Sequence, residues 1–419
     1  MTKNHIIYSN FLDYQFTLKK AKGSFLWTKE GKKLIDFTSG WNVTNLGWNH
    51  PEVTRSLIKQ AKKNTFTSMW IGDEAQIAFA NELSKYLPDG INIFCRVTGG
   101  TEANEKALIL ARSLTGRKKV IGFRDAYHGQ SFGTMSIGYR PAYVQDIAPL
   151  VPQFIQMEFP STYITQKSEE ETLNDFLEQL EQQLKTRDVA AIVTEAGIIT
   201  GWGSTHIAPR GYLREVRKLA KQYGTLLILD EVGTGLSRCG KMFGWELERV
   251  TPDIMTFAKG LTNGVAAMGA VAISDQFPQQ EVAKTKTHST FGWMPVACAA
   301  ATKVLEIHNR DQVWNTARDH GAWMLNALRQ ELNGSPTVSN IVGMGMELGI
   351  TFVENGKTRK PNDALAKSII KKSFDQGLHL ILGENGNIQI MPPLTTPKKV
   401  LEKGIEIFVD AVHKADKHL

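Results

Sequence analysis

The amino-acid sequence predicts an α/β protein, with a mainly parallel sheet in a large domain and a smaller α+β domain. Apolar, strand-like runs alternate with amphipathic helical stretches through the middle of the chain, a pattern typical of a parallel sheet covered by helices on both faces. After Pro295 the pattern changes to long helices and a second group of strands. The 419 residues are enough to bury a sizeable core.

The predicted strands of the large domain are short apolar runs. They cover residues 91–97, 119–123, 190–195, 226–232, 254–258 and 270–273. Stretches with helical apolar spacing lie between them, at residues 102–112, 173–184 and 211–223. We expect these elements to form one domain over residues 51–300.

The two ends of the chain predict the smaller domain, from residues 1–50 and 301–419. The first fifty residues contain "FLWTKEGKKLIDFTSG", which resembles a small hairpin. The C-terminal part has a helical stretch interrupted near residues 309–311, then strands and a last helix, at residues 296–332, 347–353, 387–391 and 398–414. We expect the N-terminal hairpin to pack beside this unit.

Composition argues against a membrane-spanning protein. Hydrophobic residues make up 42% and charged residues 22% of the chain, and no apolar run approaches the length needed to cross a bilayer. The N-terminal residues lack the features of an export signal. Three widely spaced cysteines, Cys95, Cys239 and Cys298, fit a reducing cytoplasm and have no metal-site spacing. We therefore expect a cytoplasmic protein without a metal ion or a membrane partner.

The net charge of +7 raises the alternative of a nucleic-acid-binding protein. The lysines are scattered among acidic residues, however, and the densest basic run, residues 398–414, is typical of a solvated helix face. We therefore expect no nucleic-acid partner.

A glycine-rich loop after the strand at 226–232 resembles the phosphate-binding loop of nucleotide hydrolases. Gly235 and the pair Gly240-Lys241 have most of the spacing of that motif, whose backbone N–H groups surround phosphates. The next residue, however, is Met242 and not the Ser or Thr that would hold Mg²⁺. The match is weak, and a nucleotide hydrolase is a minor alternative.

Two neighbouring strands carry reactive side chains near their ends. The strand at 226–232 contains Asp230, and Lys259 directly follows the strand at 254–258. Because ligands bind at the carboxyl ends of the strands in open α/β sheets, both side chains would face one ligand site. A lysine there can form a Schiff base with an aldehyde, and an acid can hold a protonated pyridine nitrogen. This combination is what pyridoxal phosphate chemistry requires, and a solvated lysine and acid at strand ends are the simpler alternative.

Two further segments favour the cofactor. "VTGGTEANEKALILAR" passes from a strand through Gly99, Gly100 and Thr101 into a helix, whose first turn has free N–H groups for a phosphate. "DAYHGQ" places Tyr127 after another strand, where its ring can stack on a flat cofactor. Taken singly, the glycines are typical of a helix cap and the tyrosine of a core.

Together these segments resemble the class III (subgroup II) aminotransferases of pyridoxal-phosphate fold type I, in the same order and over nearly the whole chain. The resemblance implies pyridoxal 5′-phosphate as cofactor and a homodimer with shared active sites. It also implies that Lys259 is the Schiff-base lysine and proton carrier, and that Asp230 is the partner of the pyridine nitrogen.

The same resemblance implies a role for each remaining residue of the cofactor site. Val232 and Tyr127 would pack on the two faces of the ring, and Gly100 with Thr101 would hold the phosphate. Thr290 of "HSTFGWMP" would reach the phosphate of the other subunit's cofactor. Two further residues complete the implied site near the ring, His128 and Glu195.

Four positions depart from the relatives that use 4-aminobutyrate, ornithine and 2-oxoglutarate. Gln389 of "NIQIMPPL" and Gln130 each stand where such relatives have an arginine. Thr200 lies near the position of a glutamate that neutralises the carboxylate-binding arginine, and Gly233 replaces a glutamine. Without the arginine the bidentate clamp for a carboxylate is missing. The departures imply a substrate other than the usual 4-aminobutyrate and 2-oxoglutarate pair.

A wide, apolar or flat-faced substrate pocket is indicated by four residues on segments that line the entrance in relatives: Trp41, Trp202, Trp293 and Met294. We expect substrate contacts from Trp41, Gln130, Trp293 and Gln389. Three arginines stay open as contacts for a carboxylate: Arg140, Arg210 and Arg238.

The leading hypothesis is an aminotransferase that moves an amino group between an amine or amino acid and a keto or aldehyde acceptor. An amino acid racemase or epimerase on the same fold is the alternative, because some family members with a tryptophan at the position of Trp41 return the proton to Cα. A cofactor-binding protein without turnover is disfavoured because Lys259 and Asp230 are both present.

Overall fold

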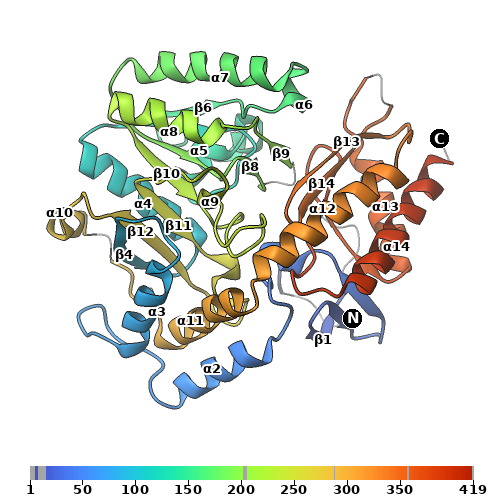
Figure 1. The fold of residues 1–419 in the computed structure, drawn as a ribbon, viewed down its shortest axis with the longest axis horizontal. Coiled ribbons are helices and arrows are strands. Elements are labelled where there is room, and N and C mark those ends of the chain that lie inside the picture. Colours follow the sequence, from blue (N-terminus) through green and yellow to red (C-terminus); the bar gives the residue numbers. More distant parts are fainter. Residues whose placement is uncertain (1–4, 8–15, 202–204, 287, 356–357, 418–419) are drawn as a thin grey trace.

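A seven-stranded sheet forms the centre of the larger part of the molecule (Figure 1). The structure is a computed structural model that describes residues 5–7, 16–201, 205–286, 288–355 and 358–417. A smaller part lies to one side of the large one and contains the C-terminal helix, with the N-terminal strands next to it (Figure 1). Among the described residues, every helix is too short or too polar to span a lipid bilayer.

The central sheet has the strand order β4-β12-β11-β10-β7-β5-β6. Strand β12 runs antiparallel to its neighbours β11 and β4, and the other neighbouring pairs are parallel. The predicted mainly parallel sheet is therefore confirmed. Its strands are β4 (Ile91–Val97), β5 (Lys119–Phe123), β6 (Phe154–Met157), β7 (Val189–Thr194), β10 (Leu226–Asp230), β11 (Ile254–Phe257) and β12 (Gly269–Ser274).

Alternate residues of the central strands face two separate apolar layers. In β10, Leu227 and Leu229 belong to the same core cluster as the buried residues of α8 (Tyr212–Tyr223). Ile228 belongs to a second cluster, which contains the buried face of α4 (Gly100–Thr115). All five residues of β10 are buried. This is why the strand has a continuous apolar sequence and why helices cover both faces of the sheet.

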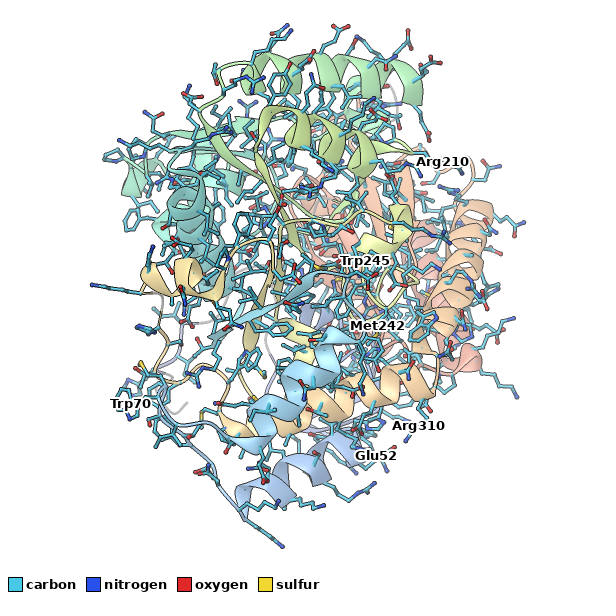
Figure 2. All side chains as sticks on the ribbon, turned by 60° about the vertical axis from the view of Figure 1, so that its left-hand side comes forward. Glu52, Trp70, Arg210, Met242, Trp245 and Arg310 are labelled. Atoms are coloured by element: carbon cyan, nitrogen blue, oxygen red, sulfur yellow. The ribbon has the colours of Figure 1, made fainter. Side chains whose placement is uncertain are left out.

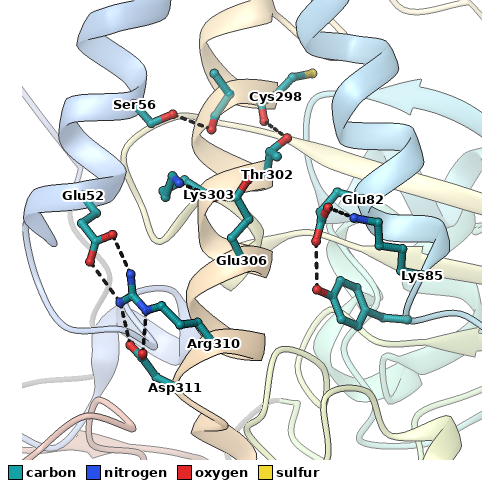
Figure 3. Close-up of polar contacts among 12 residues, drawn as sticks. Glu52, Ser56, Glu82, Lys85, Cys298, Thr302, Lys303, Glu306, Arg310 and Asp311 are labelled. Carbon is teal, nitrogen blue, oxygen red and sulfur yellow. Dashed lines mark hydrogen bonds and ion pairs between the residues drawn. The ribbon is translucent and has the colours of Figure 1, made fainter.

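Helix α2 (Pro51–Ala61) lies along α11 (Pro295–Arg310) at the lower edge of the large part (Figure 1). The guanidinium of Arg310 binds both carboxylate oxygens of Glu52, at 2.9 and 3.1 Å, and also Asp311 (Figure 3). Because these groups are exposed, packing between the helices contributes more than the ion pair. The other helices of this part are α3 (Glu74–Ser84), α5 (Phe132–Gly138), α6 (Thr162–Thr165), α7 (Glu169–Leu184), α9 (Trp245–Glu248) and α10 (Gln279–Lys284).

The smaller part contains two four-stranded sheets. One is antiparallel with the order β13-β14-β17-β16, and its strands are β13 (Val338–Met344), β14 (Glu347–Phe352), β16 (Ile381–Leu382) and β17 (Asn387–Ile390). The other has the order β1-β2-β3-β15, from β1 (Leu18–Lys22), β2 (Phe25–Thr28), β3 (Lys33–Asp36) and β15 (Leu378–His379). Because β15 pairs with β3, this sheet joins the two ends of the chain. The helices here are α12 (Val313–Glu331), α13 (Asp363–Asp375) and α14 (Lys398–Asp416).

Several elements differ from the sequence prediction. The interruption predicted near residues 309–311 is confirmed and lies slightly later, at residues 311–312 between two helices, where Gln312 has a positive φ of 50°. The strand predicted at 226–232 ends at Asp230, because Glu231 and Val232 enter a turn. The sequence pattern did not predict α2, α3, α13, β6 or β13. The domain boundaries at residues 50 and 300 stay a prediction.

A close contact between α12 and the turn from β13 to β14 provides a test of the packing. A Cβ atom on Gly321 would lie 1.8 Å from the carbonyl oxygen of Gly345. Because backbone atoms are in the way, we expect Gly321→Ala to lower the free energy of unfolding by about 1–3 kcal/mol. Thermal unfolding measures this, with Gly72→Ala as the control, since no atom lies within 4 Å of the added Cβ at Gly72. Equal melting temperatures of the two variants would contradict the contact.

Candidate active site

The carboxyl edge of the central sheet holds the predicted catalytic pair. Asp230 is the last residue of β10, and Lys259 follows the end of β11. The two strands pair in parallel, with Asp230 opposite Thr256, so both side chains leave the same edge. They line one cavity of about 330 Å³. Lys259 also lines a second cavity of about 440 Å³, so it lies where the two cavities meet.

Asp230 is buried and accepts hydrogen bonds from several elements. Its Oδ2 lies 2.6 Å from Nδ1 of His128 and 2.8 Å from Nδ2 of Asn104. Its Oδ1 accepts from the N–H of Val232 at 2.9 Å and from Oγ1 of Thr256 at 3.2 Å. Burial by itself would raise the pKa of Asp230, yet the hydrogen bonds and charge of His128, with those of Val232 and Asn104, hold the pKa below its usual value. The side chain is therefore an anion in a dry site.

The second cavity ends at the start of α4. It is lined by Thr98, Gly99, Gly100 and Thr101. The first helical hydrogen bond runs from the N–H of Ala103 to the carbonyl of Gly99, at 2.9 Å. The backbone N–H groups before Ala103 therefore have no partner within the helix, and this end of the helix dipole favours an anion.

Tyr127 and Val232 line both cavities. The ring of Tyr127 packs against Tyr139, with the centroids 6.1 Å apart. Gly129, two residues after Tyr127, has a φ of 134°, and a Cβ there would lie 2.5 Å from Oγ1 of Thr101. Glycine is required at this position because its backbone passes so close to the phosphate-side residue Thr101.

Glu195 lines the first cavity together with Thr200 and Gly233. Its carboxylate accepts a hydrogen bond from Oγ1 of Thr200 at 2.6 Å and two from the N–H of Thr200, at 3.1 and 3.3 Å. Burial and the charge of Asp230 raise the pKa of Glu195 to about 7, against the effect of these bonds. A Cβ on Gly233 would lie 2.3 Å from Oγ1 of Thr200. Thr200 thus occupies the space into which a side chain at position 233 would extend.

The predicted substrate residues occupy different places. Trp41 and Gln130 line the first cavity. Gln389 is buried and donates from Nε2 to the carbonyl of Thr200 at 3.2 Å, so it reaches the cavity wall through Thr200. Trp202 lies outside the described residues.

Trp293 lies in the core and not at the predicted position at the entrance of the substrate pocket. It is only 3% exposed, donates from Nε1 to the carbonyl of Gly269, and packs edge-on against Phe79. A large apolar ring with its one donor satisfied is stable in the core, which the sequence pattern could not distinguish from a pocket. Met294 begins α11 as its N-cap, and Thr290 lies on the surface, outside the lining of both cavities.

The three candidate arginines all lie elsewhere, and the lining described for the first cavity contains none of them. Arg238 is fully buried, and its donors bind the carbonyls of Met346 and Pro392 and the side chains of Ser39 and Asn45. Arg140 pairs with the carboxylate of Asp125. Arg210 is exposed at the edge of the molecule (Figure 2).

The glycine-rich loop after β10 is not a phosphate-binding loop. Its backbone N–H groups bond within the loop: that of Gly235 to the carbonyl of Glu231, that of Ser237 to Met242, and that of Gly240 to Ser237. Residues 236–240 are buried. The donors that would surround a phosphate are already used, so the nucleotide-hydrolase alternative is wrong.

The residues of the two cavities fit pyridoxal phosphate. Asp230, whose pKa is held low, provides an anion for a protonated ring nitrogen. The start of α4 provides N–H groups for the phosphate. Lys259 lies between these ends, lining both cavities. The sequence pattern did not find Asn104, whose spacing on α4 from Gly100 places it on the same helix face.

The contact between Thr200 and Gly233 provides a test of the site. We expect Gly233→Ala to weaken binding of pyridoxal phosphate and to lower the melting temperature, because its methyl group collides with Oγ1 of Thr200. Adding Thr200→Ala removes that oxygen and should restore most of both losses. Thr200→Ala alone is the matched control, and titration of apoprotein with cofactor is the measurement. Additive effects of the two changes would refute the contact.

Comparison with known proteins gives an independent result. The family model Aminotransferase class-III matches residues 8–412. The 5-aminovalerate aminotransferase of Pseudomonas aeruginosa is 30% identical over 396 residues, which cover 94% of this chain and 92% of that protein. The acetylornithine aminotransferase of Bacillus cereus is 30% identical over 402 residues, which cover 94% of each chain.

Solved structures agree with the sequence relatives. An (S)-enantioselective omega-transaminase from Thermomicrobium roseum has a TM-score of 0.89 at 28% identity, covering 96% of this chain and 93% of that one. A taurine:2-oxoglutarate aminotransferase from Bifidobacterium kashiwanohense, solved with PLP and glutamate, has a TM-score of 0.89 at 27% identity, covering 97% and 94%. The predicted family, fold type I and cofactor are confirmed: the chain belongs to the class III aminotransferases, enzymes that depend on pyridoxal phosphate.

Proposed function

We propose that this aminotransferase takes its amino group from an amine with an uncharged, apolar substituent, and not from 4-aminobutyrate with 2-oxoglutarate as acceptor. The observation that supports this is the charge in the substrate cavity. Among the described lining residues, the charged side chains are Glu195, Asp230 and Lys259. All three belong to the implied cofactor site: Asp230 and Lys259 would contact the cofactor directly, and Glu195, near the ring, is the charged side chain next to the substrate space.

We assign the chemical roles from the same geometry. Bound pyridoxal phosphate supplies an aldehyde that accepts the amino group and a ring that withdraws electrons from the neighbouring carbon. Asp230 holds the proton on the ring nitrogen, and Asn104 and His128 hold Asp230 in place. The amine of Lys259 would take the proton from the substrate's Cα and could return it to the aldehyde carbon of the bound cofactor. Gly100 and Thr101 bind the phosphate through their N–H groups.

The walls of the cavity support an apolar substituent. Trp41, Val43 and Tyr127 provide apolar and aromatic surface, and Gly40 and Gly201 leave room beside it. A substrate carboxylate here would face Glu195 without a cation to pair with, and an unpaired buried charge is costly. An uncharged substituent would instead gain from the removal of apolar surface from water.

A single half-reaction tests the proposed substrate class. The holoenzyme is mixed with one amine and no acceptor, and the absorbance of the bound cofactor is followed. Butylamine and 4-aminobutyrate form a matched pair that differs in one carboxylate. We expect butylamine to convert the cofactor at least about tenfold faster, a difference of about 1.4 kcal/mol. Faster conversion by 4-aminobutyrate would refute the proposal.

Two controls identify the reaction itself. Lys259→Ala should abolish conversion with every amine, since the proton carrier is missing. The cofactor released from a reacted wild-type sample should be recovered as pyridoxamine phosphate. If the cofactor is instead recovered unchanged while solvent deuterium enters Cα of the amine, the enzyme acts on that amine as a racemase does.

We also propose that the enzyme is a cytoplasmic homodimer. Three apolar side chains are exposed on the large part of the molecule. The exposed fraction is 80% for Trp70, 60% for Phe291 and 56% for Ile71. The rings of Phe66 and Phe291 lie 6.0 Å apart, and Trp70 extends from the edge of the molecule (Figure 2). Such an exposed patch is typical of an interface. Thr290 lies next to Phe291, as a residue that serves the second subunit's cofactor would.

Subunit mixing tests the shared site. Lys259→Ala and Thr290→Ala chains should each have little activity alone. In a mixed dimer, one site combines both changes and the other has neither, so activity should reappear at about a quarter of the wild-type value after random exchange. Sedimentation of the wild-type protein checks the dimer itself. A monomeric active enzyme, or mixtures that never exceed the sum of their components, would contradict the proposal.

A further inference from the structure

A left-handed turn carries Trp41 to the substrate cavity. The four residues of α1 (Ser39–Asn42), called the Trp41 turn below, have positive φ angles of 50°, 59°, 67° and 63°. One of them is glycine, and each of the other three pays a conformational cost of about 1 kcal/mol in this region. A turn of this kind persists only where surrounding contacts hold it.

The N-terminal end of the Trp41 turn is held by hydrogen bonds with Asp36, Met391 and Arg238. Asp36 is buried and accepts hydrogen bonds from the N–H groups of Thr38 and Ser39, at 2.9 and 3.1 Å. Oγ of Ser39 donates to the carbonyl of Met391, directly after β17, at 2.6 Å. Nη2 of Arg238 donates to the same Oγ at 3.2 Å. This end is therefore fixed by several independent contacts.

At the other end of the turn, the side chain of Asn42 is anchored by Glu347. Nδ2 of Asn42 donates to Oε2 of Glu347 at 2.8 Å. Glu347 is the first residue of β14 and is fully buried, and its Oε1 has no hydrogen-bond partner among the residues that the structure describes. Burial raises the pKa of Glu347 to about 7, although Arg238, Asn42 and Lys259 act in the opposite direction.

The cost of burying Glu347 indicates that the carboxyl group has a role. An apolar side chain at the start of β14 would avoid the loss of hydration, and replacing buried ionic groups by apolar ones is often neutral or stabilising. Both Nη groups of Arg238 donate to carbonyls, Ser39 and Asn45 and not to Glu347. What the carboxyl group does provide is an acceptor for Asn42.

We propose that Glu347 is a positioning residue, which fixes the Trp41 turn through Asn42 and thereby sets how large an amine substituent the enzyme accepts. Trp41 lines the cavity between the two anchored ends, so releasing one end lets the indole move away from the substrate. The effect on substrate size depends on the proposed function, in which this cavity binds the amine. The anchoring of the Trp41 turn by Glu347 does not depend on that proposal.

The first test observes Trp41 directly in apoprotein labelled with 5-fluorotryptophan. The sequence has 9 tryptophans, and Trp41→Phe identifies the fluorine resonance of Trp41 by its loss. Glu347→Met removes the acceptor at similar length and should shift and broaden that resonance. Glu347→Gln keeps an oxygen for Asn42 and should leave it near its wild-type position. Asn42→Gly, which tolerates a positive φ, should act like Glu347→Met.

The matched control is Glu231→Met, which removes another buried carboxyl group. Glu231 accepts hydrogen bonds from Thr234, Gly244 and Trp245, and none of these residues belongs to the Trp41 turn. It should leave the resonance of Trp41 unchanged. If Glu347→Met is insoluble, Asn42→Gly and Glu347→Gln still decide the matter. An unchanged resonance in Asn42→Gly, or equal shifts in Glu347→Met and Glu231→Met, would overturn the anchoring.

The second test measures size selectivity with two amines, butylamine and a bulkier one such as 2-phenylethylamine. We expect Glu347→Met and Asn42→Gly to change the ratio of their kcat/KM values by about tenfold in favour of the bulkier amine, chiefly through KM. Glu347→Gln should keep the wild-type ratio. A shifted Trp41 resonance with an unchanged ratio would overturn the selectivity role. If neither amine reacts with the wild-type enzyme, the proposed function fails, while the fluorine result still decides the anchoring.

Discussion

The active site depends on one buried anion, Asp230, kept charged where water is absent. Its hydrogen bonds come from the N-terminal half of α4, from β11, from the turn after β10 and from His128. Oδ1 of Asn104 in turn accepts from Thr256 at 2.8 Å, so α4 and β11 are tied to each other as well as to Asp230. The network that keeps Asp230 ionised therefore also sets the phosphate-side helix relative to the strand that precedes Lys259.

The carboxylate of Glu195, a neighbour of Asp230, is stabilised by hydrogen bonds from Thr200. Its carboxylate receives both the N–H and the hydroxyl of Thr200, and the space for that hydroxyl exists because residue 233 is glycine. Gln389 then holds the carbonyl of Thr200 from the other side. Thr200, Gly233 and Gln389 therefore form one contact set, which links three of the positions expected from the sequence to depart from the usual family residues.

The smaller part shapes the substrate cavity mainly by holding the two ends of the Trp41 turn. β3 ends at Asp36, and the strands β14 and β17 bring Glu347 and Met391 to the two ends of the Trp41 turn. Arg238 extends from the large part to the carbonyls of Met346 and Pro392 and to Ser39. The contacts that hold the Trp41 turn thus lie where the two parts meet. A shift of one part relative to the other would therefore change the position of Trp41.

The sequence by itself determined the fold class and the identity of the cofactor, and it proposed the residues that hold that cofactor. A short apolar run such as 226–229 indicates a strand covered on both faces, and parallel pairing places Asp230 and Lys259 at one edge. The family motifs determined the chemistry. The tertiary structure decided what periodicity does not encode: that Trp293 is core, that Arg238 is buried and binds carbonyls and side chains of the protein, that Thr200 fills the space at Gly233, and that Glu347 anchors Asn42. These are contacts between residues up to about three hundred positions apart, and whether a polar or aromatic side chain meets solvent, substrate or backbone depends on those partners and not on its neighbours in sequence.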